Sequence, residues 1–177
     1  MENTYAIQLD QALNGMVAAI DQFKNDQLNA VPFEGSWSAA QVAVHVLKSI
    51  EGLPKLFSSE AVPTGRDPHQ FEPQLKKIFL DFETKMKSPD FIVPGEGPFQ
   101  KNELMQRLSE TRRAIIEKVK DLDLSKTFAS FSFPGTGPLT GYELLCFAWC
   151  HTARHARQVT NIFTVLGSQT TVNTALQ

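Results

Sequence analysis

Helical periodicity over four long segments constrains this chain more than any other feature of its sequence. In residues 4–28, 38–53, 101–122 and 140–166, apolar side chains recur mainly at three- and four-residue steps. This spacing gathers apolar side chains on one face of an α-helix. Patterns typical of β-strands are few. The sequence therefore predicts an all-α fold, a four-helix bundle whose helices bury their apolar faces against one another.

Polar residues mark the places where two of these helices begin. Ser38 is a favourable N-cap, and Gln41, three residues later, completes a capping box. Thr140 and Glu143 repeat this pattern before the last segment. Gly167 is of the residue type that most often follows the end of a helix. We therefore expect the last helix to end just before it.

A long connection, residues 58–99, separates the second predicted helix from the third. It holds six prolines, which do not fit a helix interior, and only residues 73–87 have a short helical pattern. Pro54, just before this connection, is expected to kink or end the second helix. A connection of this length can cross the bundle, so the second and third helices need not be adjacent antiparallel neighbours.

Length, charge and hydropathy argue against several kinds of protein. The 177 residues fit one domain, 1–177, that can bury a single core. A formal net charge of −2 gives no reason to expect a nucleic acid or an anionic membrane as partner. No stretch approaches the roughly 18 consecutive apolar residues that span a bilayer. The first residues lack the basic and apolar regions of a signal peptide, so we expect a cytoplasmic protein.

The last predicted helix carries two of the four histidines, His151 and His155. On a helical wheel these two lie about 40° apart on the core face, and Gln158 lies within about 20° of His151. Cys146 and Cys150 face elsewhere, and two cysteines four residues apart in one helix are poorly placed for a disulfide. We interpret the histidines as candidate ligands and both cysteines as reduced thiols.

A third histidine, His45, lies on the second predicted helix. It shares a small and polar stripe in an otherwise apolar segment, as expected for the wall of a wet cavity. Burying an imidazole is costly unless its nitrogens have partners, so each histidine either has its own hydrogen bond or shares a ligand. One divalent ion could satisfy His45, His151 and His155 together and keep positions open for water.

Three stretches of the chain, "WSAAQVAVHVLKS", "KMKSPDFIVP" and "HTARHARQV", resemble the DinB/YfiT-like superfamily of four-helix-bundle metalloproteins. The first is similar to the family's W-S-x-x-(E/Q)-x-x-x-H helix start, and the last to its H-x-x-x-H pattern followed by glutamine. The resemblance implies that His45, His151 and His155 bind a divalent metal, often nickel or zinc. It also implies that the helices run in a crossed order.

Any chemistry must come mostly from the metal, because no Ser-His-Asp or paired-carboxylate arrangement can be placed from the sequence. Characterised members of the resembled family include thiol-dependent S-transferases and isomerases. We expect a metal-dependent enzyme acting on a small molecule, a thiol S-transferase or a hydrolase, with a low-molecular-weight thiol as one candidate partner. Thr152 occupies the position of the glutamate in H-E-x-x-H proteases, which argues against a protease. The alternative is a non-catalytic metal-binding bundle with a stress-response or binding role.

Four further features have both a functional and a structural interpretation. Gln158 could orient His155 or hold a water on the ion, or it could be a polar residue at a bundle end. Arg154 and Arg157 are expected to face solvent rather than an anionic substrate. The thirteen phenylalanines could line an apolar pocket, fill the core or form a dimer seam. Apolar surface beyond one stripe per helix favours a homodimer.

Overall fold

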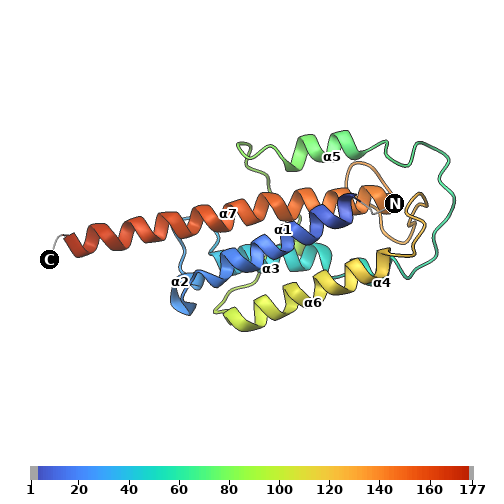
Figure 1. Cartoon of the computed structure of the whole chain (residues 1–177). Helices are drawn as coiled ribbons and strands as arrows, with labels where there is room; N and C mark the ends of the chain where they lie inside the picture. The colour runs from blue at the N-terminus through green and yellow to red at the C-terminus, as the bar shows by residue number, and fades with distance from the viewer. Residues whose placement is uncertain (1–3, 176–177) are drawn as a thin grey trace.

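Four long helices form the body of the protein (Figure 1). The computed structural model describes residues 4–175. Its long helices are α1 (Thr4–Asp21), α3 (Ala39–Ile50), α6 (Lys101–Val119) and α7 (Gly141–Ala175). The shorter elements are α2 (Asn25–Asn29), α4 (Leu53–Leu56), α5 (Glu72–Phe79) and the 3₁₀ helix η1 (Asp90–Ile92). The described residues form isolated β-bridges but no strand, so the predicted all-α fold is confirmed.

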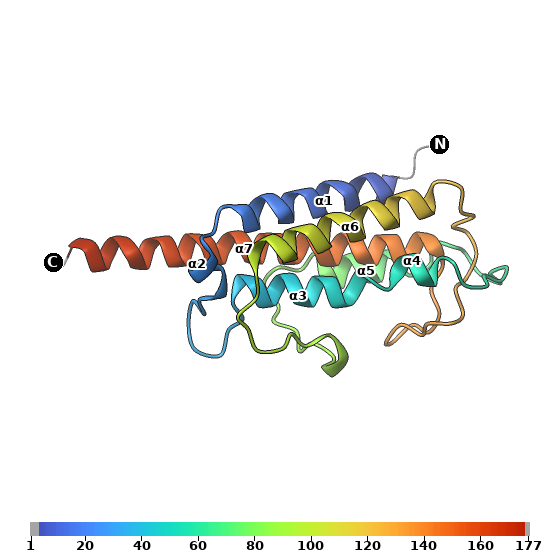
Figure 2. The ribbon, with the colours of Figure 1, turned by 90° about the horizontal axis from the view of Figure 1, so that it is seen from below.

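The long helices do not follow their chain order around the bundle. α1 packs against α6 and α7, and α3 packs against the same two helices. α1 and α7 run in one direction, whereas α3 and α6 run in the other (Figures 1 and 2). The chain must therefore return along the bundle between α3 and α6, which confirms the predicted crossover connection. α3 and α6 are neighbours, but parallel ones.

Both predicted capping boxes are present and fix where α3 and α7 begin. The Gln41 backbone N–H donates to Ser38 Oγ at 3.2 Å, and the Ser38 N–H donates to Gln41 Oε1 at 3.0 Å. At α7, the Thr140 N–H donates to Glu143 Oε2 at 2.9 Å, and the Glu143 N–H donates to Thr140 Oγ1 at 3.3 Å. These bonds satisfy N–H groups that a helix start leaves unpaired. The histidines of both helices are thereby held in a defined register.

The first helix is shorter than its periodicity predicts, because the chain breaks at residues 22–24 and restarts as α2. The break conserves the apolar pattern, since Phe23 and Leu28 are both buried in the core. The Lys24 backbone N–H donates to Gln27 Oε1 at 3.2 Å, which starts α2. The α2 residue Asn29 then bonds the Phe99 backbone through both its amide oxygen and its amide nitrogen. α2 therefore holds the end of the crossover against the bundle.

The predicted helical segment 73–87 is also too long, because α5 ends at Phe79. Just beyond it, Asp81 Oδ1 accepts the backbone N–H groups of Glu83 at 3.0 Å and Thr84 at 3.2 Å. An aspartate that bonds nearby backbone in this way offers the chain an alternative to continued helix. Residues after Leu80 are thus free to form a loop against the bundle.

The last helix continues beyond the predicted end at Gly167. Gly167 is not among the glycines with positive φ, and α7 extends to Ala175. A glycine inside a helix costs only about 1 kcal/mol relative to alanine, which does not force an end. The C-terminal turns of α7 project past the other helices (Figures 1 and 2). Within residues 4–175, every helix is too short or too polar to span a bilayer.

An ion pair between the half-buried Arg66 and the fully buried Glu143 fastens the start of the crossover to α7. Arg66 donates to Glu143 Oε1 at 2.7 Å and to Oε2 at 2.6 Å, and the Phe71 backbone N–H donates to Oε1 at 2.8 Å. Burial would raise the pKa of Glu143, but Arg66 and the N–H groups of Thr140 and Phe71 more than offset this and lower the pKa below its ordinary value. The carboxylate is therefore charged, and it joins α7 to the segment before α5.

Candidate metal centre

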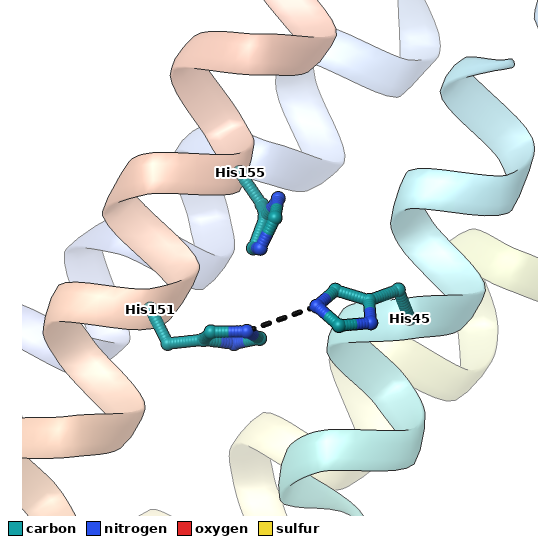
Figure 3. A group of neighbouring side chains, drawn as sticks. All are labelled: His45, His151 and His155. Carbon is teal, nitrogen blue, oxygen red and sulfur yellow. Dashed lines mark hydrogen bonds between the residues drawn. The ribbon is translucent and has the colours of Figure 1, made fainter. Parts of the chain in front are cut away.

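Three histidines from two helices converge inside the bundle. His45 comes from α3, and His151 and His155 come from successive turns of α7 (Figure 3). One ring nitrogen of each lies within 4.8 Å of those of the other two. The three side chains are 2%, 4% and 9% exposed, respectively. The spacing of four residues in α7 and the buried stripe of α3 thus produce the convergence predicted from the sequence.

Hydrogen bonds to carbonyl oxygens orient two of the three rings. His45 Nδ1 donates to the Ile92 carbonyl oxygen at 2.9 Å, and His155 Nδ1 donates to Gln158 Oε1 at 2.8 Å. Because Nδ1 holds the proton, Nε2 of each ring has its lone pair available. A partner on the distal nitrogen is how proteins fix the tautomer and orientation of a histidine ligand. Ile92 therefore orients His45, and Gln158 orients His155, to bind a cation.

His151 differs, because its Nδ1 has no hydrogen-bond partner among the described residues. Its Nε2 lies 3.0 Å from His45 Nε2. Since His45 Nε2 carries no proton, this contact needs a proton on His151 Nε2. If that proton moved to the unpartnered Nδ1 of the same ring, one cation could bind the Nε2 lone pairs of both histidines. Three imidazole nitrogens that can act as ligands, together with the buried His151 ring whose Nδ1 has no hydrogen-bond partner, fit a divalent transition metal.

Burial keeps the three imidazoles neutral. Desolvation lowers the pKa of His45, and desolvation together with the neighbouring rings lowers the pKa of His151 well below its usual range. The pKa of His155 falls to about 3, again mainly through desolvation. Neutral imidazole is the form that binds metal ions. At neutral pH, no proton would have to leave these rings before an ion could bind.

The histidines form the floor of an open cleft with a volume of about 1060 Å³. Phenylalanine rings surround them, among them Phe79 at 5.6 Å and Phe147 at 5.2 Å from the His151 ring centroid. Residues 82–93 of the crossover form one wall. Within the described part of the chain, no His, Cys, Asp or Glu joins the three histidines as a fourth ligand. The cleft therefore gives a small molecule direct access to the cluster.

Side chains of α3 and α7 attach this crossover wall to the bundle. Lys48 Nζ donates to the Val93 carbonyl oxygen at 2.7 Å. Arg154 donates to the carbonyl oxygens of Asp81 and Thr84. Together with the bond from His45 to Ile92, these contacts link the position of the wall to the orientation of a candidate ligand.

The other residues singled out from the sequence lie in different surroundings. Cys146 and Cys150 are free and fully buried, and neither joins the histidine cluster. The fourth histidine, His69, contacts Glu72 in the crossover. Arg154 and Arg157 both line the cleft; Arg157 is exposed as expected, whereas Arg154 is half-buried and bonds the crossover. The Ile92 carbonyl was missed, because a backbone acceptor in an irregular connection leaves no mark in the sequence.

A family model described as the DinB superfamily matches residues 8–159. The chain belongs to the DinB superfamily. The matched range contains all three histidines and Gln158, and it confirms the resemblance seen in the sequence motifs. Comparisons with curated proteins and with solved structures found no match. The DinB assignment therefore rests on the family model and agrees with the fold and the histidine cluster.

Proposed function

We propose that this DinB-superfamily protein is a divalent-metal-dependent enzyme that acts on a small molecule, as a thiol S-transferase or a hydrolase. One observation carries the proposal: three neutral imidazoles converge at the floor of an open cleft without a fourth protein ligand among the described residues. Structural zinc sites are normally closed by a fourth protein ligand, whereas catalytic sites keep a position open. The arrangement supports catalysis over a purely structural ion.

His45, His151 and His155 would hold the ion, with nickel or zinc as the proposed metals because an all-imidazole site suits these late divalent cations. When bound, the ion would act as a Lewis acid and lower the pKa of a water or thiol in the cleft. Ile92 and Gln158 fix two of the rings through Nδ1. The phenylalanine rings around the floor would exclude bulk water and strengthen electrostatic interactions there.

A low-molecular-weight thiol is the proposed partner for the S-transferase reaction, and the cytoplasm is the proposed location. The two unpaired, buried cysteines support a reducing compartment. The non-catalytic alternative, a metal-binding bundle with a binding or stress-response role, requires no access to the ion. The open cleft favours the enzyme.

The test begins with the metal content of protein purified without a histidine tag and then incubated with zinc or nickel. We expect one ion per chain. The variant His155→Ala should lose the ion yet keep its helical circular dichroism, because the apolar core supplies most of the stability and the lost side chain costs only about 1–2 kcal/mol. No metal uptake by the wild-type protein would refute the metal site.

Activity is then measured with a panel of small thiols plus an electrophile, and with a panel of esters and amides. We expect turnover by the metal-loaded protein and none by His155→Ala. Stoichiometric metal without turnover in either panel would favour the non-catalytic alternative. Retention of stoichiometric metal by His155→Ala would show that the ligand set is wrong.

A further inference from the structure

Exposed apolar side chains gather at the mouth of the cleft. Of the eleven large apolar side chains that are exposed in the described part of the chain, seven line this cleft. The two most exposed are Phe91, at 66%, and Phe33, at 60%. Single exposed apolar residues are ordinary, but a contiguous group marks a binding surface. The mouth is therefore suited to an apolar group that extends beyond the histidine floor.

The same cleft collects basic side chains that have no carboxylate partner. Lys48, Lys85, Lys87, Arg154 and Arg157 line it, against only two acidic residues, a formal charge of +3 in a chain whose total is −2. None of these five forms a salt bridge within the described residues, whereas seven lysines and arginines elsewhere do. A concave surface lined by one sign of charge attracts ligands of the opposite sign.

Three of the five basic residues are available to a ligand. Lys48 and Arg154 already donate to backbone carbonyls of the crossover wall. Lys85 and Lys87 are exposed and belong to that wall. Arg157 is also exposed, and its guanidinium lies 4.8 Å from the centre of the Phe82 ring. This pair places a cation directly beside an apolar surface at the mouth.

We propose that the substrate of this site is an amphipathic anion, a small molecule with an apolar body and a carboxylate, sulfonate or phosphate group. Its body packs on the aromatic mouth, and its anionic group lies near Lys85, Lys87 and Arg157. This inference rests on the proposed function, since it names the substrate class for the same cleft. A substrate of this class would account both for the exposed apolar residues that gather at the mouth and for the basic residues there that form no salt bridge.

The first experiment compares three probes of equal chain length, decanoate, decanol and decyltrimethylammonium, by calorimetry below their micelle concentrations. Chelator is present throughout, so that a carboxylate cannot bind through a metal ion. We expect decanoate to bind at least about tenfold more tightly than decyltrimethylammonium, because exposed charges contribute modestly but in the same direction. Octanoate should bind about tenfold more weakly than decanoate, as expected for two fewer buried methylenes.

A second experiment neutralises the three available cations together, as Lys85→Gln, Lys87→Gln and Arg157→Gln. Decanoate affinity should fall about tenfold while decanol affinity stays the same. A matched control changes the net charge equally with three exposed lysines that form no salt bridge and lie outside the cleft: Lys55→Gln, Lys77→Gln and Lys118→Gln. The control should bind decanoate like the wild type.

The apolar contribution is tested with Phe91→Ser at the mouth and Ile7→Ser as control, since Ile7 is exposed on α1 and lies outside the cleft. Phe91→Ser should weaken both decanoate and decanol, and Ile7→Ser neither. Equal or tighter binding of decyltrimethylammonium, or equal effects of both triple variants, would overturn the proposal. The proposal would also be overturned if the protein sedimented with anionic phospholipid vesicles but showed no saturable binding of decanoate.

Failure of this inference can be told from failure of the proposed function. Because the probes are measured with chelator, decanoate binding does not depend on the ion. Saturable decanoate binding without metal uptake would retain the substrate class and reject the metal-dependent enzyme. One bound ion per chain without anion preference would do the reverse.

Discussion

His151 and His155 project from adjacent turns of α7, but only His155 has a side-chain partner for its outer nitrogen, Gln158. We predict that Gln158→Leu weakens metal affinity about 10- to 100-fold, the usual effect of removing such a partner. Gln158→Glu should retain or increase affinity, because a carboxylate also accepts the Nδ1–H. Competition with a chromophoric chelator measures both. Equal affinity of Gln158→Leu and the wild type would show that this bond does not orient the ligand.

The lowered histidine pKa values predict how the metal-free protein responds to acid. In the unfolded chain these groups titrate near 6.5, whereas His155 in the folded protein titrates near 3. Between these values the unfolded state binds a proton that the folded state does not, so the free energy of unfolding falls as pH falls. The slope is about 1.4 kcal/mol per pH unit for each such histidine. Above about pH 6.5 these histidines are unprotonated in both states, so they no longer make the free energy of unfolding depend on pH.

Urea unfolding in chelator, at pH steps between about 4 and 8, measures this slope. In the variant His155→Gln, the slope of the free energy of unfolding against pH should be smaller by about the contribution of one histidine. A free energy of unfolding that does not change between about pH 7 and pH 5 would contradict the buried, neutral state of the cluster.

Much of the site could be predicted at this scale, because helix geometry alone places His151, His155 and Gln158 on one face. The convergence of His45 with these residues could be predicted from the apolar character of its helix and from the resemblance to known motifs. The acceptor at Ile92 could not be predicted, since it belongs to backbone far from His45 in the sequence. The role of Arg154 was missed for the same reason: its partners are carbonyls of an irregular loop.

At the scale of helices and connections, the ion pair between Arg66 and Glu143 is the contact with the clearest energetic consequence. The Glu143 side chain is 0% exposed, so Arg66→Ala would leave a buried carboxylate without its counter-charge. We predict a loss of about 3–5 kcal/mol in the free energy of unfolding. Arg107→Ala is the matched control, because Arg107 and its partner Glu51 are both more than 40% exposed. That loss should stay below about 1 kcal/mol.

Urea unfolding at neutral pH compares the two variants with the wild type. Losses of similar size would show that the Glu143 carboxylate is stabilised without Arg66. Because α7 carries two of the candidate ligands, metal affinity should also fall in Arg66→Ala and not in the control.

Helix existence was predictable, but helix ends were only partly so. Capping boxes identified the starts of α3 and α7 because their chemistry is local. The break after α1 was hidden, since Phe23 and Leu28 keep their apolar spacing on both sides of it. The continuation through Gly167 was hidden too, because glycine permits a helix end without requiring one.

At the scale of the whole molecule, we retain the prediction of a homodimer but change its basis. The apolar side chains on all sides of α3 are buried within a single chain, so they leave no surplus apolar surface for a dimer. Phe163 is also occupied, because it packs edge-on against Phe23 with ring centroids 5.0 Å apart. The projecting end of α7 is the remaining reason, because helices in proteins gain most of their stability by packing against another element, which a second copy could supply. Light scattering should give twice the 19.7 kDa chain mass at micromolar concentration. A chain ended at Gly167 should be monomeric, and a monomeric full-length protein would refute the dimer.

The contact between His45 and His151 spans 106 positions of the sequence. An ion shared by these residues would act as a reversible cross-link between the two halves of the chain, closing a loop that includes the whole crossover. Such a cross-link opposes global opening as a long-range disulfide does, but it lasts only while the ion is bound. Degradation in the cell, which depends on opening, would then be faster whenever metal is scarce. The abundance of the protein would follow the metal supply without any change in its synthesis.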